Sequence, residues 1–140
     1  MRLYLDANVI IPLFTTDKFS DRARALVENE DHDLFISDFT AAEFASVIAV
    51  RFRRRELDEE QARSVFLVFD TWTETETPLE TATSADIHVA TNALRRLDLN
   101  LRAPDAIHIA IALRLGLTLA TFDERMAAAA RELGLAVLES

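Results

Sequence analysis

Hydrophobic and polar positions along the chain predict short buried strands separated by helices. Apolar runs of three or four residues occur at 3–5, 34–36, 117–120 and 135–138. Runs this short and this uniformly apolar are typical of strands that are covered on both faces. Residues 73–77 alternate Thr and Glu, which favours an edge strand with one wet face. The pattern therefore predicts about five strands.

The segments between these strands carry helix signals. Asp58 with Gln61 forms a capping-box pattern. Pro104 suits the first position of a helix, and Gly116 and Gly134 follow helix-like segments as left-handed C-terminal residues do. Because strands and helices alternate, we expect an α/β domain whose mainly parallel sheet is flanked by helices on both faces. The expected helices are a short one opened by Asp6 and Asn8, then 19–28, 38–55, 58–71, 84–97, 104–115 and 124–133.

Composition narrows the class of protein. The 140 residues suit a single domain, 1–140, with an ordinary globular core. The chain has no cysteine, which excludes disulfides, thiolate metal sites and cysteine nucleophiles. No apolar run approaches the ~18 residues of a membrane span, and Asp6 comes too early for a signal peptide. We therefore expect a cytoplasmic protein without a membrane partner.

The net charge of −9 argues against a nonspecific binder of nucleic acid. It is compatible with an enzyme that holds cations in a cleft of carboxylates. The chain contains one lysine, Lys18, and its other basic residues are arginines.

Four acidic residues fall where the strands of a parallel sheet would end. Asp6 follows the first strand, Glu43 lies in the helix after the second, Asp105 opens a late helix and Asp123 follows the strand 117–120. The carboxyl ends of parallel strands meet at one edge of the sheet. Carboxylates gathered there need protonation or a hard cation, and oxygen ligands favour Mg²⁺ or Mn²⁺, which activate water for phosphoryl chemistry. Each acid taken singly also fits a helix cap or a helix-dipole contact.

The residues around these acids resemble the motifs of a known family. They are Leu5-Asp6-Ala7-Asn8, Ser37-x-x-Thr40-x-x-Glu43, Arg102-Ala103-Pro104-Asp105-Ala106-Ile107-His108 and Ala120-Thr121-Phe122-Asp123. In this order they are similar to the four motifs of PIN-domain nucleases, and the compact length resembles the VapC-type toxins of toxin–antitoxin pairs. The last motif is shorter than the Thr-x-Asn-x-x-Asp form of many members.

The resemblance implies a three-layer fold with a five-stranded sheet of order 3-2-1-4-5. It implies a Mg²⁺- or Mn²⁺-dependent endoribonuclease that hydrolyses RNA with water, forms a homodimer and is inhibited by a cognate antitoxin. Carried over by position, Asp6, Glu43, Asp105 and Asp123 match the acidic metal ligands. Asn8 and Thr121 match the polar residues that support them.

Other features have weaker interpretations. The dense basic cluster of Arg51, Arg53, Arg54 and Arg55 is either an RNA-phosphate contact or a solvated helix end. His108 lies one turn after Asp105, and we expect a packed core histidine more than a hydrogen bond to that carboxylate. The wide apolar arcs of residues 44–52 and 65–69 suggest a groove for an antitoxin segment.

Two other function classes remain open. A receiver-like or phosphatase-like phosphotransfer domain also places aspartates at strand ends. It needs a lysine late in the chain, and Lys18 is early. A catalytically silent PIN-like binding module is the second alternative, and retention of all four acids argues against it.

Overall fold

The computed structural model describes residues 1–139, which form a four-stranded parallel sheet of order β3-β2-β1-β4. The central strand β1 (Arg2–Leu5) pairs with β2 (Asp33–Ser37) on one side and with β4 (Thr118–Ala120) on the other. The edge strand β3 (Leu79–Glu80) pairs with β2. All pairings are parallel, as predicted, so the strands end at the same edge of the sheet.

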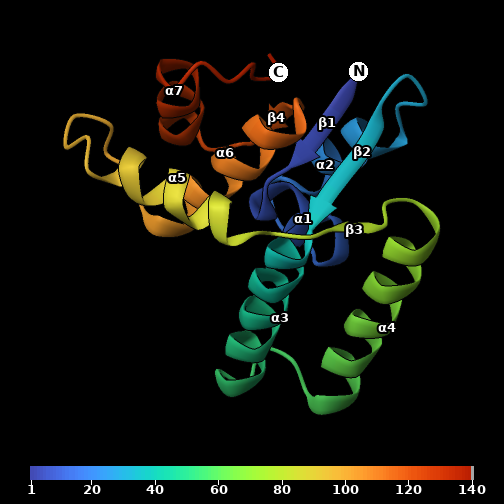
Figure 1. Ribbon diagram of the computed structural model, residues 1–140. Coiled ribbons are helices and arrows are strands. Elements are labelled where there is room, and N and C mark those ends of the chain that lie inside the picture. Colours follow the sequence, from blue (N-terminus) through green and yellow to red (C-terminus); the bar gives the residue numbers. More distant parts are fainter. Residues whose placement is uncertain (140) are drawn as a thin grey trace.

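Helices flank the sheet on both sides, which confirms the predicted three layers (Figure 1). On one face, Leu3 and Leu5 of β1 join a core with α1 and Phe44 of α3. On the other face, Tyr4 joins a core with Leu119 and residues of α6 and α7. This alternation follows from the period of two along a strand. The helices are α1 (Ala7–Phe14), α2 (Ser20–Glu28), α3 (Asp38–Arg53), α4 (Glu59–Thr75), α5 (Ser84–Leu94), α6 (Ala103–Leu115) and α7 (Glu124–Glu132).

The α3–α4 pair forms a long hairpin that projects from the body of the molecule (Figure 1). Both helices begin with a capping box: Ser37 with Thr40 in α3 and, as the sequence predicts, Asp58 with Gln61 in α4. The polar first turns explain why each helix begins directly after a strand or a tight turn.

The predicted edge strand at 73–77 is wrong, because α4 continues to Thr75. The threonine hydroxyls bond back to carbonyls of the preceding turn: Thr75 donates to Thr71 and Thr73 donates to Asp70. Such bonds satisfy the side chains inside a helix, so the Thr/Glu alternation does not require a strand. The edge strand begins instead after Pro78, at Leu79.

The predicted fifth strand, 135–138, is reduced within the described chain to one parallel bridge between Val137 and Leu119. Two backbone bonds hold it: Leu119 N–H donates to Ala136 and Leu138 N–H donates to Leu119. The segment therefore lies beside β4, at the place predicted for a fifth strand, but it is too short to count as one.

An ion pair between the buried Asp86 and the exposed Arg114 joins α5 to α6. Arg114 donates two hydrogen bonds to Asp86, at 2.8 and 3.0 Å, and a third to the carbonyl of Thr81. The backbone N–H of Thr83 also donates to the Asp86 carboxylate. Burial alone would raise the pKa of Asp86, but these hydrogen bonds outweigh it and the pKa is lowered.

No helix within residues 1–139 is long and apolar enough to cross a lipid bilayer.

Candidate metal centre

Asp6 stands at the carboxyl end of β1, where the chain enters α1. Its backbone N–H bonds to the carbonyl of Ala120 in β4 at 3.0 Å, which extends the sheet by one residue. Its side chain makes no capping bond to α1 and instead accepts a hydrogen bond from Thr121 Oγ1 at 2.8 Å. With Asp6 only 6% exposed, the carboxylate is not a surface helix cap.

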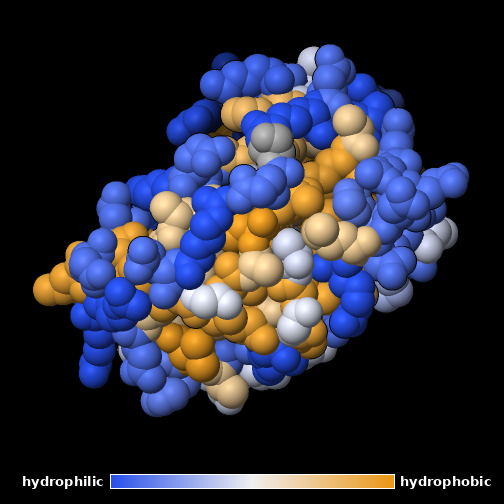
Figure 2. Space-filling view, turned by 90° about the horizontal axis from the view of Figure 1, so that it is seen from above, coloured by the Kyte–Doolittle hydropathy of each residue, from blue (hydrophilic) through white to orange (hydrophobic). Residues whose placement is uncertain are grey.

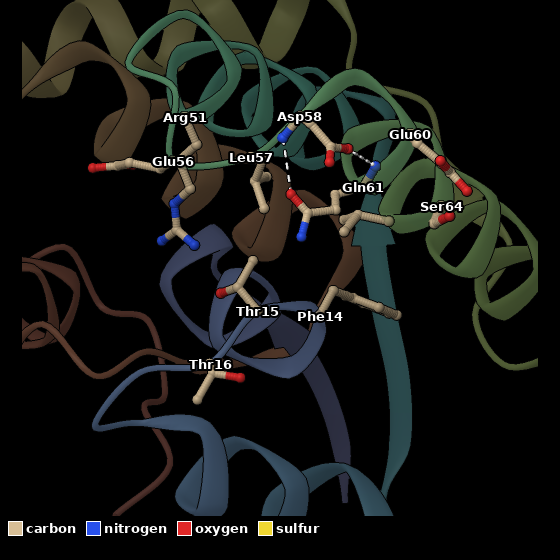
Figure 3. A pocket seen from close by; sticks show the side chains of 11 residues that line it. Phe14, Thr15, Thr16, Arg51, Glu56, Leu57, Asp58, Glu60, Gln61 and Ser64 are labelled. Atoms are coloured by element: carbon tan, nitrogen blue, oxygen red, sulfur yellow. Dashed lines mark hydrogen bonds between the residues drawn. The ribbon is translucent and has the colours of Figure 1, made fainter.

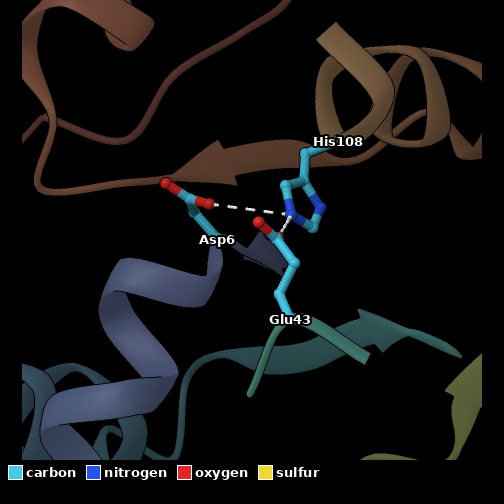
Figure 4. A group of neighbouring side chains, drawn as sticks. All are labelled: Asp6, Glu43 and His108. Carbon is cyan, nitrogen blue, oxygen red and sulfur yellow. Dashed lines mark hydrogen bonds and ion pairs between the residues drawn. The ribbon is translucent and has the colours of Figure 1, made fainter. Parts of the chain in front are cut away.

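Glu43 and His108 complete a cluster with Asp6 (Figure 4). Glu43 comes from the second turn of α3 and His108 from α6. His108 Nε2 bonds to Glu43 Oε1 and lies 3.9 Å from Asp6 Oδ1. One ligand atom from each of the three side chains lies within 4.8 Å of the others. Elements far apart in the sequence thus converge on one point.

Tyr4 anchors the far side of the His108 ring. The tyrosine hydroxyl is 2.7 Å from His108 Nδ1 and 2.8 Å from Ser37 Oγ. Burial raises the pKa of the Tyr4 phenol, so this group stays protonated and acts as a neutral hydrogen-bonding partner. Tyr4 of β1 therefore fixes the orientation of the imidazole ring in which Nε2 points toward Glu43.

Asp105 lies close enough to Asp6 to affect its charge. Asp105 is 9% exposed, and its Oδ2 has no hydrogen-bond partner among the described residues. Two arginines lie at ion-pair distance from this oxygen, Arg102 at 3.9 Å and Arg125 at 3.8 Å. Asp105 therefore presents a buried carboxylate oxygen whose charge is only partly compensated.

Asp123 has a structural role in addition to its place near the other acids. Its Oδ1 accepts the backbone N–H groups of Arg125 and Met126, which caps α7. Arg125 lies 3.7 Å from Asp123 and 3.8 Å from Asp105, so one guanidinium lies between the two carboxylates.

Asn8 and Thr121, predicted to support the acids, bond to each other. Asn8 Nδ2 donates to Thr121 Oγ1 at 3.0 Å, and Thr121 in turn donates to Asp6. Asn8 Oδ1 accepts the backbone N–H of Phe122 at 3.1 Å. This chain holds the start of α1 against the loop after β4.

The electrostatics of the cluster favour a cation. Burial raises the pKa of Asp6, the charges of Glu43 and Asp105 raise it further, and His108 and Thr121 offset only part of this effect. A divalent ion would remove the cost of a buried, repelled carboxylate. The residues present fit such an ion, because the carboxylate oxygens of Asp6 and Glu43 converge with His108. Asp105 lies outside this group of three but has a buried carboxylate oxygen without a hydrogen-bond partner among the described residues.

The cluster differs from the oxygen-only set that the sequence suggested, because it contains an imidazole. His108 is 1% exposed, which fits the expected packed histidine. It contacts Glu43 and Asp6, however, rather than Asp105. In the sequence, only its place one helical turn after Asp105 indicates that His108 faces the acidic residues.

The arginine cluster lies away from this centre. Arg51 and Arg53 are in the last turn of α3 and Arg54 ends it, roughly 16 Å along the helix from Glu43. Arg51 lines a cavity of about 840 Å³ between the end of α1 and the start of α4, together with Glu56 and Asp58 (Figure 3). The structure does not bring these arginines to the acidic cluster.

Part of the expected groove along α3 and α4 is filled by aromatic side chains of α1, α3 and α4. Phe44 and Phe69 stack at 4.3 Å and Phe14 packs edge-on against both. A cavity of about 140 Å³ remains beside Phe52 and Phe66. Of the predicted apolar arcs, Phe44, Ile48 and Phe69 are therefore core, whereas Phe52, Leu67 and Val68 are exposed.

The fold and the site together define an α/β domain with a candidate metal centre at the carboxyl edge of a parallel sheet. The chain belongs to the PIN domain family, whose pattern matches residues 3–132. No curated protein matches the chain.

Solved toxin structures share this fold over nearly the whole chain. VapC20 of Mycobacterium tuberculosis, described as a sarcin–ricin loop cleaving toxin, has a TM-score of 0.75 at 18% identity and covers 99% of both chains. VapBC2 of Rickettsia felis, bound to a promoter DNA fragment, has a TM-score of 0.68 at 15% identity, covering 99% of this chain and 98% of that one. A toxin–antitoxin complex from Klebsiella pneumoniae has a TM-score of 0.63 at 21% identity and covers 90% of each chain. The structural neighbours are thus toxins of VapBC-type systems and related toxin–antitoxin complexes.

Proposed function

We propose that this chain is a divalent-metal-dependent endoribonuclease and the toxin component of a toxin–antitoxin pair. The observation that carries the proposal is the convergence of Asp6, Glu43 and His108 within 4.8 Å of one another at the carboxyl edge of the sheet. The unbonded, buried oxygen of Asp105 beside Asp6 adds to it. Holding the carboxylates of Asp6 and Glu43 close together costs stability through charge repulsion and burial, and a bound cation would offset this cost.

Asp6, Glu43 and Asp105 are the groups that would hold Mg²⁺ or Mn²⁺, and Asp123 would contribute from the cap of α7. A bound divalent ion supplies charge stabilisation to a phosphodiester and lowers the pKa of water. The chain's own contribution is positional. Thr121 and Asn8 orient Asp6 through hydrogen bonds.

His108 positions Glu43 and is itself positioned by Tyr4. A buried imidazole between a phenol and a carboxylate also provides a route for a proton at Nε2, close to both Asp6 and Glu43. We assign it the task of holding Glu43 in a fixed geometry.

RNA as the substrate is supported by the fold shared with VapC20, a toxin described as cleaving the sarcin–ricin loop. We propose Arg51, Arg53, Arg54 and Arg55 as a distal contact to RNA phosphates. Their place at the end of the projecting hairpin suits a long substrate better than a short one (Figure 1). A toxin with this substrate acts in the cytoplasm.

An antitoxin is the proposed protein partner, because the neighbours include toxin–antitoxin complexes. A homodimer is the proposed assembly. Figure 2 shows a broad hydrophobic patch in the middle of one face, surrounded by hydrophilic residues. Patches of this kind are typical of interaction surfaces.

Cleavage of RNA with and without metal tests the proposal. We expect the parent chain to cut single-stranded RNA in millimolar Mg²⁺ or Mn²⁺ and to be inactive in EDTA. Asp105→Asn should reduce the cleavage rate by about a hundredfold or more, because it removes a charged ligand. Asp98→Asn is the matched control, since Asp98 is an exposed surface carboxylate paired with Arg96.

A parent chain without metal-dependent cleavage would contradict the nuclease assignment. Metal binding without cleavage, seen as a melting temperature that rises with Mn²⁺, would favour the catalytically silent module instead. Equal cleavage by Asp105→Asn and the control would leave the nuclease class standing and remove Asp105 from the site.

A further inference from the structure

A cluster of two aromatic rings and two cations lies directly beside the metal centre. Phe19 and Phe122 stack with their ring centroids 5.3 Å apart and their planes 20° apart. The guanidinium carbon of Arg22 lies 4.4 Å from the centroid of Phe122, and Lys18 Nζ lies 5.1 Å from that of Phe19. We call these four residues the aromatic ledge.

The ledge is joined to the acidic centre through the backbone. Phe122 stands between Thr121 and Asp123, and its N–H donates to Asn8 Oδ1 at 3.1 Å. Asn8 also donates to Thr121, which donates to Asp6. The network that orients Asp6 therefore also fixes the position of the Phe122 ring.

The ledge carries two cations, and two exposed acids of the same segment, Asp17 and Asp21, lie next to them in the sequence. The chain carries −9, yet the ledge places two cations on exposed positions, Lys18 and Arg22, with half-buried rings beside them. Two further arginines, Arg102 and Arg125, lie at ion-pair distance from Asp105. An anionic chain that approaches the acidic centre would meet these cations first.

We propose that the aromatic ledge is a nucleotide subsite, which holds one base of a single-stranded RNA next to the phosphate at the metal centre. The inference rests on the proposed function and deepens it. A base stacks on the outer face of the Arg22 guanidinium, whose other face lies over the Phe122 ring, and Lys18 and Arg22 contact the adjoining phosphates. Since every base offers a π-face, the subsite orders the strand and adds little preference for one base.

Binding measurements with uncleaved RNA test the subsite. Fluorescence anisotropy of a labelled single-stranded RNA of about 12 nucleotides, in EDTA and low salt, reports affinity without metal-dependent cleavage. We expect Phe122→Leu to weaken binding roughly fivefold or more at all salt concentrations, because it removes stacking. Arg22→Gln should weaken binding and also lower the slope of log affinity against log salt by about one, because it removes a phosphate contact.

The chain offers a matched control pair. Arg2 lies 5.1 Å from the ring centroid of Phe35, which is the same type of contact. It is in the amino-terminal half of the sheet, away from the carboxyl edge. Arg2→Gln and Phe35→Leu should leave RNA affinity and its salt slope unchanged.

Folding and function are separated as follows. Melting temperatures identify any variant that is poorly folded. If Phe122→Leu unfolds, the RNA affinity of Arg22→Gln, which changes an exposed position, tests the subsite instead. Ledge variants that bind RNA as well as the parent would overturn the inference, and so would a parent without RNA binding. If the parent still cuts RNA in Mg²⁺, the proposed function survives that result. Weakened ledge variants in a chain that cuts nothing would support the subsite and contradict the nuclease.

Discussion

Two buried aspartates show how differently this chain treats a carboxylate. Asp86 is 2% exposed and Asp6 is 6% exposed. Asp86 receives two hydrogen bonds from Arg114 and one from a backbone N–H, and its pKa is lowered. Asp6 receives one hydrogen bond from Thr121, shares its surroundings with two other acids, and its pKa is raised.

The charge of Asp6 is compensated only in part, by Thr121 and His108, whereas that of Asp86 is fully paired. The fold is able to pair a buried acid fully, as it does between α5 and α6, but it places no arginine in contact with Asp6 among the described residues. The nearby Arg102 and Arg125 stay at 3.8 Å or more from Asp105. A site of this kind is suited to a cation from solution.

The largest expected effect is at the paired carboxylate. Asp86→Asn should lower the free energy of unfolding by about 2 kcal/mol, because Arg114 and the α5 cap lose a charged acceptor. Urea unfolding measures the change. A loss of under about 0.5 kcal/mol, the size of an ordinary surface substitution, would show that the Asp86–Arg114 pair adds little stability, and Asp86 would then not differ from Asp6 as described.

The same substitution at the uncompensated carboxylate should have the opposite sign. Asp6→Asn in EDTA should raise the free energy of unfolding by about 1 kcal/mol, because it removes a buried, repelled charge. Adding Mn²⁺ should stabilise the parent and reverse the order. Thermal melts of both chains with EDTA and with Mn²⁺ measure this, and destabilisation of the metal-free variant would refute the interpretation.

An effect of similar size is expected at Tyr4, whose hydroxyl holds the His108 ring in place. Tyr4→Phe should cost about 1 kcal/mol of stability, since Ser37 and His108 lose a buried partner. RNA cleavage should fall only a few-fold, because the acids remain. Thr71→Val, which removes a hydroxyl that bonds within α4 on the surface, is a suitable comparison. Equal cleavage by Tyr4→Phe and the parent would show that His108 needs no anchor.

The smallest expected effect is that of Asp6→Asn in acid. The raised pKa of Asp6 means that its cost is present above that pKa and fades as pH falls toward the usual value of 3.8. Asp86 has a lowered pKa, so its contribution is complete above 3.8 and is lost only below it. Urea midpoints at stepwise lower pH should therefore lose the Asp6→Asn gain first. Loss of the Asp86 contribution first would contradict these pKa directions.

The strands and most helices were predictable from local pattern. The runs at 3–5, 34–36 and 117–120 became β1, β2 and β4 because each is apolar on both faces and lies between two helix layers. The segment 73–77 failed because threonine side chains satisfied themselves within α4. Local alternation cannot distinguish those two outcomes.

The site was predictable in part. Asp6 and Glu43 converge as the strand-end argument requires. The contact between His108 and Glu43 joins positions 65 residues apart. It depends on how α3 and α6 are placed relative to each other, and the sequence of either helix alone does not show this. The sequence allowed Asp123 to be either a helix cap or a metal ligand. The structure shows that it caps α7, and the role as a metal ligand stays a prediction.

The sheet order has a consequence for a chain emerging from the ribosome. The strand that carries Asp6 is made first, but its partner β4 and the helix that carries His108 are made near the end. Nascent polypeptide would therefore hold Asp6 and Glu43 for most of synthesis without the elements that gather them. Under the proposed function, a growing chain of this topology would therefore not cleave the RNA of its own ribosome until nearly all of residues 1–139 had been translated.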